Sequence, residues 1–262
     1  YIIEQIYPLN EKSILNISNK IIEIKEKYLT ENNKIYYSII PDKNYFINKN
    51  NLKINYKDIE NIINNNLNFG KYIEIFNLLK LEDYYKTDSH WKQENLIKIA
   101  QKFGSEMNLK LNNNYEEKIL TEFKGVYSGQ LSINNEKDEI KILTNNILEN
   151  CILYNYEKNE NTSIYNIDKI NSLDKYDIYL SGAVSLLSIE NPESDIGKEL
   201  IVFRDSFASS FIPLLIEGYD KITLVDTRYI SPKILDKYIN FNNQDILFLY
   251  STSVINNSYS LK

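Results

Sequence analysis

The sequence is poor in the residue types that mark several protein classes. Its single cysteine, Cys151, excludes an internal disulfide and a cysteine-rich zinc site. No apolar run is long enough to span a bilayer, and no signal peptide is visible. With 7 glycines and 5 prolines the chain has no obvious flexible linker, and it shows no internal repeat. Tandem domains are therefore disfavoured, and we expect a single domain over residues 1–262.

Basic residues are too dispersed to suggest a nucleic-acid partner. The 30 lysines and arginines are outnumbered by 36 acidic residues, and no basic cluster could track a phosphate backbone. Only Arg204 and Arg228 are arginine, and a planar guanidinium is hard to replace by lysine where geometry is fixed. Arg228 is a candidate for substrate binding or for a salt bridge to Asp205 or Asp226. For Arg204, a structural ion pair is the simpler interpretation.

Hydrophobic periodicity predicts alternating helices and strands. Helical segments are predicted at 11–29, 56–66, 92–103, 206–217 and 232–239. Short apolar strands are predicted at 35–40, 177–180, 199–203, 222–226 and 245–250, and a short strand or a helical turn at 73–80. Strands that alternate with helices pair in parallel, which predicts an α/β sheet with helices on its faces.

Residues 105–175 interrupt this alternation. The segment is polar and rich in asparagine, with β-type fragments at 125–127, 140–143 and 152–154. We interpret it as a partly β insertion rather than as an independent domain.

Histidine and tryptophan occur once each, as the neighbours His90 and Trp91. Histidine suits proton transfer near neutral pH, and Asp88 precedes it by two positions. In an extended or irregular backbone, residues at i and i+2 project to the same side, so Asp88 can orient the imidazole. The alternative is metal ligation by the same pair. A zinc site is poorly supported by one histidine without a cysteine cluster, and no metal or cofactor is expected.

A candidate nucleophile, Ser206, follows the predicted strand 199–203. The carboxyl ends of strands are where ligands approach an open α/β sheet, and backbone N–H groups of the next turn can stabilise an oxyanion there. The alternative is that Ser206 or Asp205 simply caps the following helix. The distance from Ser206 Oγ to His90 Nε2 separates these interpretations.

Three segments together resemble a known family. They are Tyr-Tyr-Lys-Thr-Asp-Ser-His-Trp at 84–91, Arg-Asp-Ser-Phe at 204–207 and Val-Asp-Thr-Arg-Tyr at 225–229. The combination resembles the bacterial DHHW family, which is similar to the alginate O-acetyltransferase group of SGNH-hydrolase-like proteins. A Pro-Asp-Lys at 41–43 also resembles an element of that group. The resemblance implies a three-layer α/β/α SGNH-hydrolase-like fold with a mostly parallel sheet.

The resemblance also implies a catalytic triad, with Ser206 as nucleophile, His90 as general base and Asp88 orienting the histidine. Such a site transfers an acyl group in two steps through an acyl-serine. It implies an O-acyltransferase or acetylesterase for an extracellular polysaccharide, with transfer favoured. The expected partners are an acetylated polysaccharide or acetyl donor and a membrane-bound protein that supplies acetyl groups. We expect an extracytoplasmic location, at the cell surface or secreted, and an anchor or signal that once preceded Tyr1.

The sequence departs from the family pattern in two places. Ser89 replaces the middle histidine of the Asp-His-His-Trp motif, at a position that points away from the pair. Ala183 stands where related sequences often have the asparagine of Gly-Gly-Asn, which leaves the backbone N–H groups of Ser206 and Gly182 as expected oxyanion donors. The alternative function is a weak or inactive SGNH-like surface protein that binds glycan or scaffolds an assembly.

Besides Arg228, two residues are candidates for substrate binding: Tyr229 and Trp91. Trp91 could stack on a sugar, but a packing role that fixes the loop is favoured, because buried aromatic side chains dominate core energetics.

Overall fold

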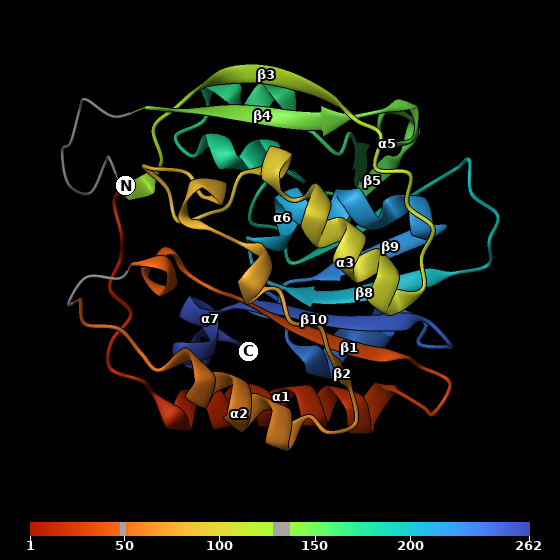
Figure 1. Cartoon of the computed structure of the whole chain (residues 1–262). Helices are drawn as coiled ribbons and strands as arrows, with labels where there is room; N and C mark the ends of the chain where they lie inside the picture. The colour runs from red at the N-terminus through yellow and green to blue at the C-terminus, as the bar shows by residue number, and fades with distance from the viewer. Residues whose placement is uncertain (48–50, 128–136) are drawn as a thin grey trace.

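The computed structural model describes residues 1–47, 51–127 and 137–262. Its centre is an eight-stranded sheet in the order β2-β1-β10-β8-β9-β7-β5-β6 (Figure 1). Neighbours from β2 to β9 pair in parallel, and β7, β5 and β6 continue the sheet antiparallel. Strands β3 and β4 form a separate antiparallel pair. The strands are β1 (Ile35–Ile40), β2 (Lys71–Tyr72), β3 (Glu116–Phe123), β4 (Asp138–Thr144), β5 (Ile152–Asn155), β6 (Glu160–Thr162), β7 (Leu186–Glu190), β8 (Glu199–Arg204), β9 (Lys221–Val225) and β10 (Asp245–Ser251).

Helices cover both faces of the main sheet (Figure 1). They are α1 (Glu11–Tyr28), α2 (Tyr56–Asn66), α3 (Ile97–Met107), α5 (Asn146–Asn150), α6 (Ala208–Phe211) and α7 (Thr252–Asn256). Alternate residues of β8 face opposite layers, as a strand requires. Leu200 and Val202 belong to the core that includes α3, while Ile201 and Phe203 belong to the core that includes α1 and α2. The fold is therefore a three-layer α/β/α arrangement, as predicted.

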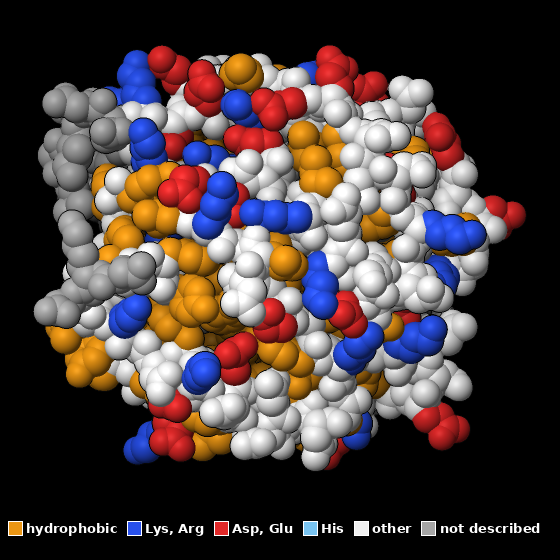
Figure 2. All heavy atoms as spheres, in the orientation of Figure 1, with side chains coloured by type: hydrophobic (Ala, Val, Ile, Leu, Met, Phe, Trp, Pro, Cys, Tyr) orange, Lys and Arg blue, Asp and Glu red, His pale blue; other side chains and the backbone are white. Residues whose placement is uncertain are grey.

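The first helix shows why these segments fold as they do. The Asn10 side chain accepts a hydrogen bond from the Ser13 N–H and caps α1. Ile14, Ile17 and Ile21 then recur at helical spacing and are buried against the sheet. None of the helices in the described ranges is long and apolar enough to cross a membrane. On the face seen in Figure 2, acidic and basic side chains are interspersed.

Most of the predicted elements are found where the sequence placed them. The predicted helices 11–29 and 56–66 correspond to α1 and α2, and the predicted strand 35–40 is β1. The predicted strands near 200, 224 and 247 are β8, β9 and β10. In 73–80 the helical-turn alternative is correct, because a 3₁₀ turn occupies Phe76–Leu78.

The strand predicted at 177–180 is wrong. The chain forms the 3₁₀ helix η6 (Lys175–Ile178) and then turns through left-handed backbone at Leu180 and Ser181. Its apolar side chains are buried, and Tyr179 makes an isolated antiparallel bridge with Tyr165, but the segment is not a strand of either sheet. Periodicity cannot separate such a segment from a short strand. The strand beside β9 is instead β7, which the sequence analysis missed.

Four other segments differ in detail. The predicted helix 206–217 is divided between α6 and the 3₁₀ helix η7 (Ile212–Gly218), with Pro213 in its first turn. Residues 232–239 form a 3₁₀ helix over Pro232–Lys237, and α3 starts later than the predicted 92. The β-type fragment at 125–127 is not a strand.

The predicted insertion 105–175 contributes to two sheets. Strands β3 and β4 form the small sheet, whereas β5 and β6 extend the main sheet beyond β7. Part of the segment, 128–136, lies outside the described residues.

Candidate active site

Asp88 and His90 lie on a short loop that is closed at its base. Tyr84 and Trp91 form an isolated antiparallel bridge, and the Tyr85 N–H donates to the His90 carbonyl at 3.0 Å. The Lys92 N–H donates to the Asp83 carbonyl at 2.7 Å. These bonds place Asp88 and His90 at the tip of one hairpin-like loop.

Two buried charged side chains hold this loop through its backbone. Lys43 Nζ donates to the carbonyls of Tyr85 and Asp88, at 3.1 and 2.7 Å. From β4, Asp138 accepts from the Lys86 N–H at 2.9 Å and from the Thr87 N–H at 2.8 Å. Burial lowers the pKa of Lys43 to about 8, against the opposing charges of Asp88 and Asp138.

The segment after β3 closes over Asp88. The Val126 N–H donates to Asp88 Oδ2 at 3.1 Å. Gly125 allows this approach, because a Cβ there would lie 2.3 Å from Asp88 Cβ. Burial alone would raise the pKa of Asp88, but the charge of His90 and hydrogen bonds from His90 and Val126 hold that pKa below its usual range.

Ser206 stands in a tight turn between β8 and α6. Asp205 fixes this turn: its Oδ1 accepts from the Phe207 N–H at 3.0 Å and its Oδ2 from the Ser251 N–H at 2.7 Å. The Asp205 carboxylate thus accepts the hydrogen bonds of the backbone N–H groups at this turn, which leaves the Ser206 hydroxyl to contact His90. Of the two alternatives for Ser206, helix capping does not describe its side chain.

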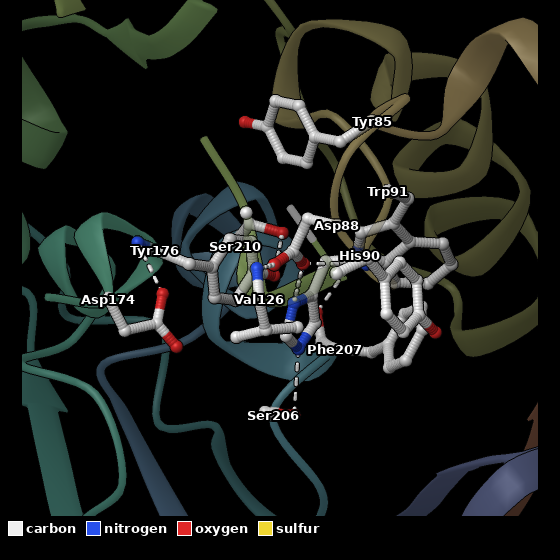
Figure 3. Close-up of polar contacts among 12 residues, drawn as sticks. Tyr85, Asp88, His90, Trp91, Val126, Asp174, Tyr176, Ser206, Phe207 and Ser210 are labelled. Carbon is white, nitrogen blue, oxygen red and sulfur yellow. Dashed lines mark hydrogen bonds and ion pairs between the residues drawn. The ribbon is translucent and has the colours of Figure 1, made fainter. Parts of the chain in front are cut away.

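The three side chains form a continuous relay (Figure 3). His90 Nε2 lies 2.8 Å from Ser206 Oγ, and His90 Nδ1 lies 2.6 Å from Asp88 Oδ1. A carboxylate beside Nδ1 keeps the proton of a neutral imidazole on that nitrogen, so Nε2 accepts from the serine hydroxyl. Asp88 is completely buried and His90 is 8% exposed. The arrangement can move the Ser206 proton to His90 while the hydroxyl oxygen attacks an electrophile.

Aromatic rings contact the imidazole outside this relay. Tyr176 of η6 stacks on His90 with ring centroids 3.8 Å apart and an interplanar angle of 9°. Phe207 packs at 4.8 Å and is tilted by 52°. Hydrogen bonds to Asp88 and Ser206 therefore hold the imidazole within its plane, and the rings of Tyr176 and Phe207 hold it from outside that plane.

A cavity of about 140 Å³ opens at Ser206. Lys43 and Arg228 bring positive charge to its wall, and Glu4, Asp42 and Asp205 bring carboxyl groups. Burial raises the pKa of Asp42, although hydrogen bonds from Thr252 and Tyr56 oppose this shift. The lining residues are Glu4, Ile6, Asp42, Lys43, Ser89, Tyr127, Asp205, Ser206, Phe207, Arg228, Ser251, Ser253 and Val254. Neither at this cavity nor elsewhere do the described residues contain a group of three or more His, Cys, Asp or Glu side chains placed to hold a metal ion.

Both arginines meet at Asp226. Arg228 binds its carboxylate with Nε at 2.9 Å and Nη2 at 2.7 Å, and also lines the cavity. Both alternatives for Arg228 are therefore compatible with its position. Arg204 is fully buried, with Nη1 at 3.7 Å from Asp226 Oδ2 and 3.1 Å from Ser209 Oγ. This matches the structural ion pair predicted for Arg204.

Two predicted substrate-binding residues lie away from the cavity. Trp91 is completely buried, its Nε1 donates to the Phe207 carbonyl at 2.9 Å, and its ring packs on Phe207 and Phe211. It has no exposed surface for a sugar, so the substrate-binding assignment is corrected to packing. Tyr229 is 44% exposed beneath the Arg228 guanidinium and does not line the cavity.

The two predicted oxyanion donors differ. The Gly182 N–H donates to the Tyr179 carbonyl at 3.2 Å, and the glycine packs so closely on Asp177 that a Cβ would lie 2.2 Å from its Oδ1. Gly182 is therefore not available as an oxyanion donor, which corrects that prediction. The Ser206 N–H has no hydrogen-bond acceptor within the described part of the chain and remains available.

Sequence reasoning missed the residues that support the relay. Lys43 belongs to the Pro-Asp-Lys element noted above, but its targets are backbone carbonyls, which leave no trace in side-chain patterns. Asp138 likewise binds mainly backbone N–H groups. Tyr176 is one of 22 tyrosines, and nothing in its local sequence distinguishes it.

Comparisons with known proteins agree on the fold. No protein-family model and no curated protein matches the chain. Among solved structures, a DHHW family protein from Eubacterium siraeum is similar with a TM-score of 0.80 and 18% identity, over 98% of this chain and 89% of the other. Bacillus cereus PatB1 with a sulfonyl adduct gives 0.74 and 18%, over 97% and 96%. The O-acetyltransferase domain of Pseudomonas putida AlgJ gives 0.55 and 10%, over 94% and 84%. The chain therefore has the fold of a DHHW family protein, as its sequence predicted.

Proposed function

We propose that this protein is a serine-dependent O-acetyltransferase or acetylesterase that acts on an extracellular polysaccharide, with transfer to a sugar hydroxyl as its main reaction. The observation that carries this proposal is the hydrogen-bonded relay from Ser206 through His90 to Asp88, with heavy-atom distances of 2.8 and 2.6 Å. These distances lie within the reach required of a nucleophile and its general base.

The reaction proceeds in two steps. Ser206 Oγ attacks the carbonyl carbon of an acetyl ester while His90 Nε2 takes its proton, and the resulting imidazolium then protonates the departing alcohol. In the second step His90 deprotonates a sugar hydroxyl or water, which attacks the acetyl-serine, and the imidazolium returns the proton to the departing Ser206 Oγ. The Ser206 N–H donates to the oxyanion in both steps.

Other parts of the site receive roles in this scheme. The cavity of about 140 Å³ admits the acyl group, and Arg228 on its wall contacts the acceptor or donor. Asp205 fixes the turn that presents Ser206. Support for an acetyl group comes from the fold shared with the O-acetyltransferase domain of Pseudomonas putida AlgJ. An extracytoplasmic location and a membrane-bound partner that supplies acetyl groups belong to the same proposal.

A covalent probe and an ester substrate test it. Phenylmethylsulfonyl fluoride should add one sulfonyl group to Ser206, located by peptide mass spectrometry, and p-nitrophenyl acetate should be hydrolysed. Both signals should disappear in Ser206→Ala and His90→Ala and persist in Ser105→Ala, which changes an exposed serine on α3. Addition of acetylated and unacetylated oligosaccharides then distinguishes transfer from hydrolysis by the appearance of acetylated acceptor.

A non-catalytic surface protein is the outcome to which a negative result points. If the intact mass does not change after prolonged exposure to the probe and no ester is hydrolysed, the relay is inactive. The protein would then be better described as an SGNH-like glycan-binding or scaffolding protein.

A further inference from the structure

Tyr176 makes the closest ring contact to the base of the relay. Its ring lies parallel to the His90 imidazole, with centroids 3.8 Å apart and a 9° angle between the planes. Figure 3 shows the two rings beside each other, with Ser206 at the far nitrogen of the histidine. The contact is a full stack rather than an edge approach.

The surroundings fix Tyr176 in this position. Its hydroxyl is 2.8 Å from Ser210 Oγ, and its N–H donates to Asp174 Oδ1 at 3.0 Å. The rings of Tyr85 and Tyr179 pack around it at 6.4 and 5.0 Å. Burial holds the pKa of Tyr176 well above its usual range, so the phenol stays neutral. The stacked ring is therefore a rigid, uncharged aromatic plate.

The polar contacts of His90 lie in the plane of its ring, and its stacking contact with Tyr176 lies above that plane. Asp88 and Ser206 take the two ring nitrogens, which lie in the plane of the imidazole. Tyr176 covers one face at stacking distance. It does not line the Ser206 cavity, so it contacts the base and not a bound substrate.

The charge of the imidazole changes during the reaction, and the stacked ring responds to that change. His90 is neutral when its Nε2 accepts from Ser206 and becomes an imidazolium once it has taken the serine proton. The face of an aromatic ring carries partial negative charge and attracts a cation, most strongly where water is excluded. The contact therefore strengthens as the transition state forms, which is the condition for an interaction to accelerate a reaction.

We propose that Tyr176 is a positioning residue that stabilises the imidazolium of His90 during acyl transfer. This rests on the proposed function of the Ser206 relay. The aromatic ring carries the effect, and the hydroxyl serves only to hold the ring against Ser210.

A spectroscopic test needs no catalysis. His90 is the sole histidine, so its ring C–H protons give one unambiguous pair of NMR signals. An aromatic ring stacked at 3.8 Å shifts those signals upfield. Tyr176→Leu should move them downfield, and Tyr176→Phe should leave them near their wild-type positions.

Kinetics then measure the contribution of the ring. With an aryl acetate, Tyr176→Leu should lower kcat and kcat/KM together by about tenfold, with KM within about twofold, because the contact strengthens in the transition state. Tyr176→Phe should keep activity within about threefold, since it keeps the aromatic face. Tyr165→Leu is the matched control: it also removes a buried tyrosine ring, and no ring contact joins it to His90.

The outcomes separate this inference from the proposed function. An active wild type and a Tyr176→Leu variant with shifted His90 signals but unchanged kcat would overturn the role of Tyr176. That role is equally overturned if Tyr176→Phe loses as much activity as Tyr176→Leu. An inactive wild type with normal His90 signals would overturn the proposed function instead. If Tyr176→Leu does not fold, Tyr176→Met gives the same comparison with a longer apolar side chain.

Discussion

Replacing Asp88 with asparagine tests what the carboxylate contributes to the relay. Asp88 Oδ1 accepts from His90 Nδ1 at 2.6 Å and from the His90 backbone N–H at 3.0 Å. Its Oδ2 accepts from the Val126 N–H at 3.1 Å. An asparagine amide has nearly the same shape, but one of its two ends is a donor. No orientation of that amide satisfies all three contacts, so one buried N–H loses its acceptor, at about 1 to 3 kcal/mol of stability.

The two amide orientations have different chemical consequences. With the amide oxygen toward His90, the imidazole keeps its proton on Nδ1 and loses only the charge that stabilises the imidazolium. Replacing a charge-assisted bond by a neutral one costs about 1 to 2 kcal/mol, or roughly tenfold in rate. With the amide nitrogen toward His90, the proton moves to Nε2, which can no longer accept from Ser206. That wrong tautomer costs about 10⁴ in kcat in serine hydrolases with the same relay.

Nitrogen-15 NMR reads the tautomer directly, because His90 is the sole histidine. We expect Asp88→Asn to reduce kcat/KM for an aryl acetate by at least about tenfold, and by about 10⁴ if the proton is on Nε2. The temperature of unfolding should also fall. Asp168→Asn, at an exposed position, should change neither. Wild-type turnover and stability in Asp88→Asn would refute the reasoning.

Two further substitutions test the support of the loop. Burial lowers the pKa of Lys43 to about 8, so between pH 8 and about 10.5 the unfolded state binds more protons than the folded state. The free energy of unfolding of the wild type should therefore rise with pH in this range, relative to that of Lys43→Met, by up to about 1.4 kcal/mol per pH unit. Urea unfolding at pH 7.5 and 9.5 measures this, and a pH-independent difference would contradict it. Gly125→Ala should lower thermal stability and ester turnover together, because the new Cβ would lie 2.6 Å from the Thr87 carbonyl oxygen. Gly197→Ala is the control: its new Cβ meets no atom within 4 Å, so turnover should be unchanged, although alanine at a φ of +69° costs about 1 kcal/mol of stability. Equal losses of turnover in the two variants would argue against a specific role for Gly125.

The sequence predicted the parallel core because its signals there are strong and repeated. The strands near 200, 224 and 247 are buried runs separated by predicted helical segments, and strands that alternate with helices pair in parallel. The proximity of Asp88 to His90 was also predictable, since it depends on two residues at i and i+2. The approach of Ser206 to His90 spans 116 positions; the place of Ser206 at a strand end made it a candidate, and the family resemblance paired it with His90.

The segment around Gly182 shows why other features were not predictable. Residues 177–180 look like a buried strand, but the chain forms the end of η6 there and then turns through left-handed backbone at Leu180. This turn follows the helix η6 that carries Tyr176, and it ties the Gly182 N–H to Tyr179. The apolar residues predict burial, whereas the choice between a strand and a compact turn depends on tertiary contacts.

The order of strands in the sheet has a consequence for biosynthesis. Strand β10 lies between β1 and β8, although it is the last of the sheet strands to leave the ribosome. Until it emerges, β1 and β8 have no common neighbour, and the Ser251 N–H is not in place to hold Asp205 beside Ser206. The turn that carries Ser206 is therefore completed only when translation has passed Ser251. Premature termination before that point would release a chain with two unpaired central strand edges, which favours aggregation.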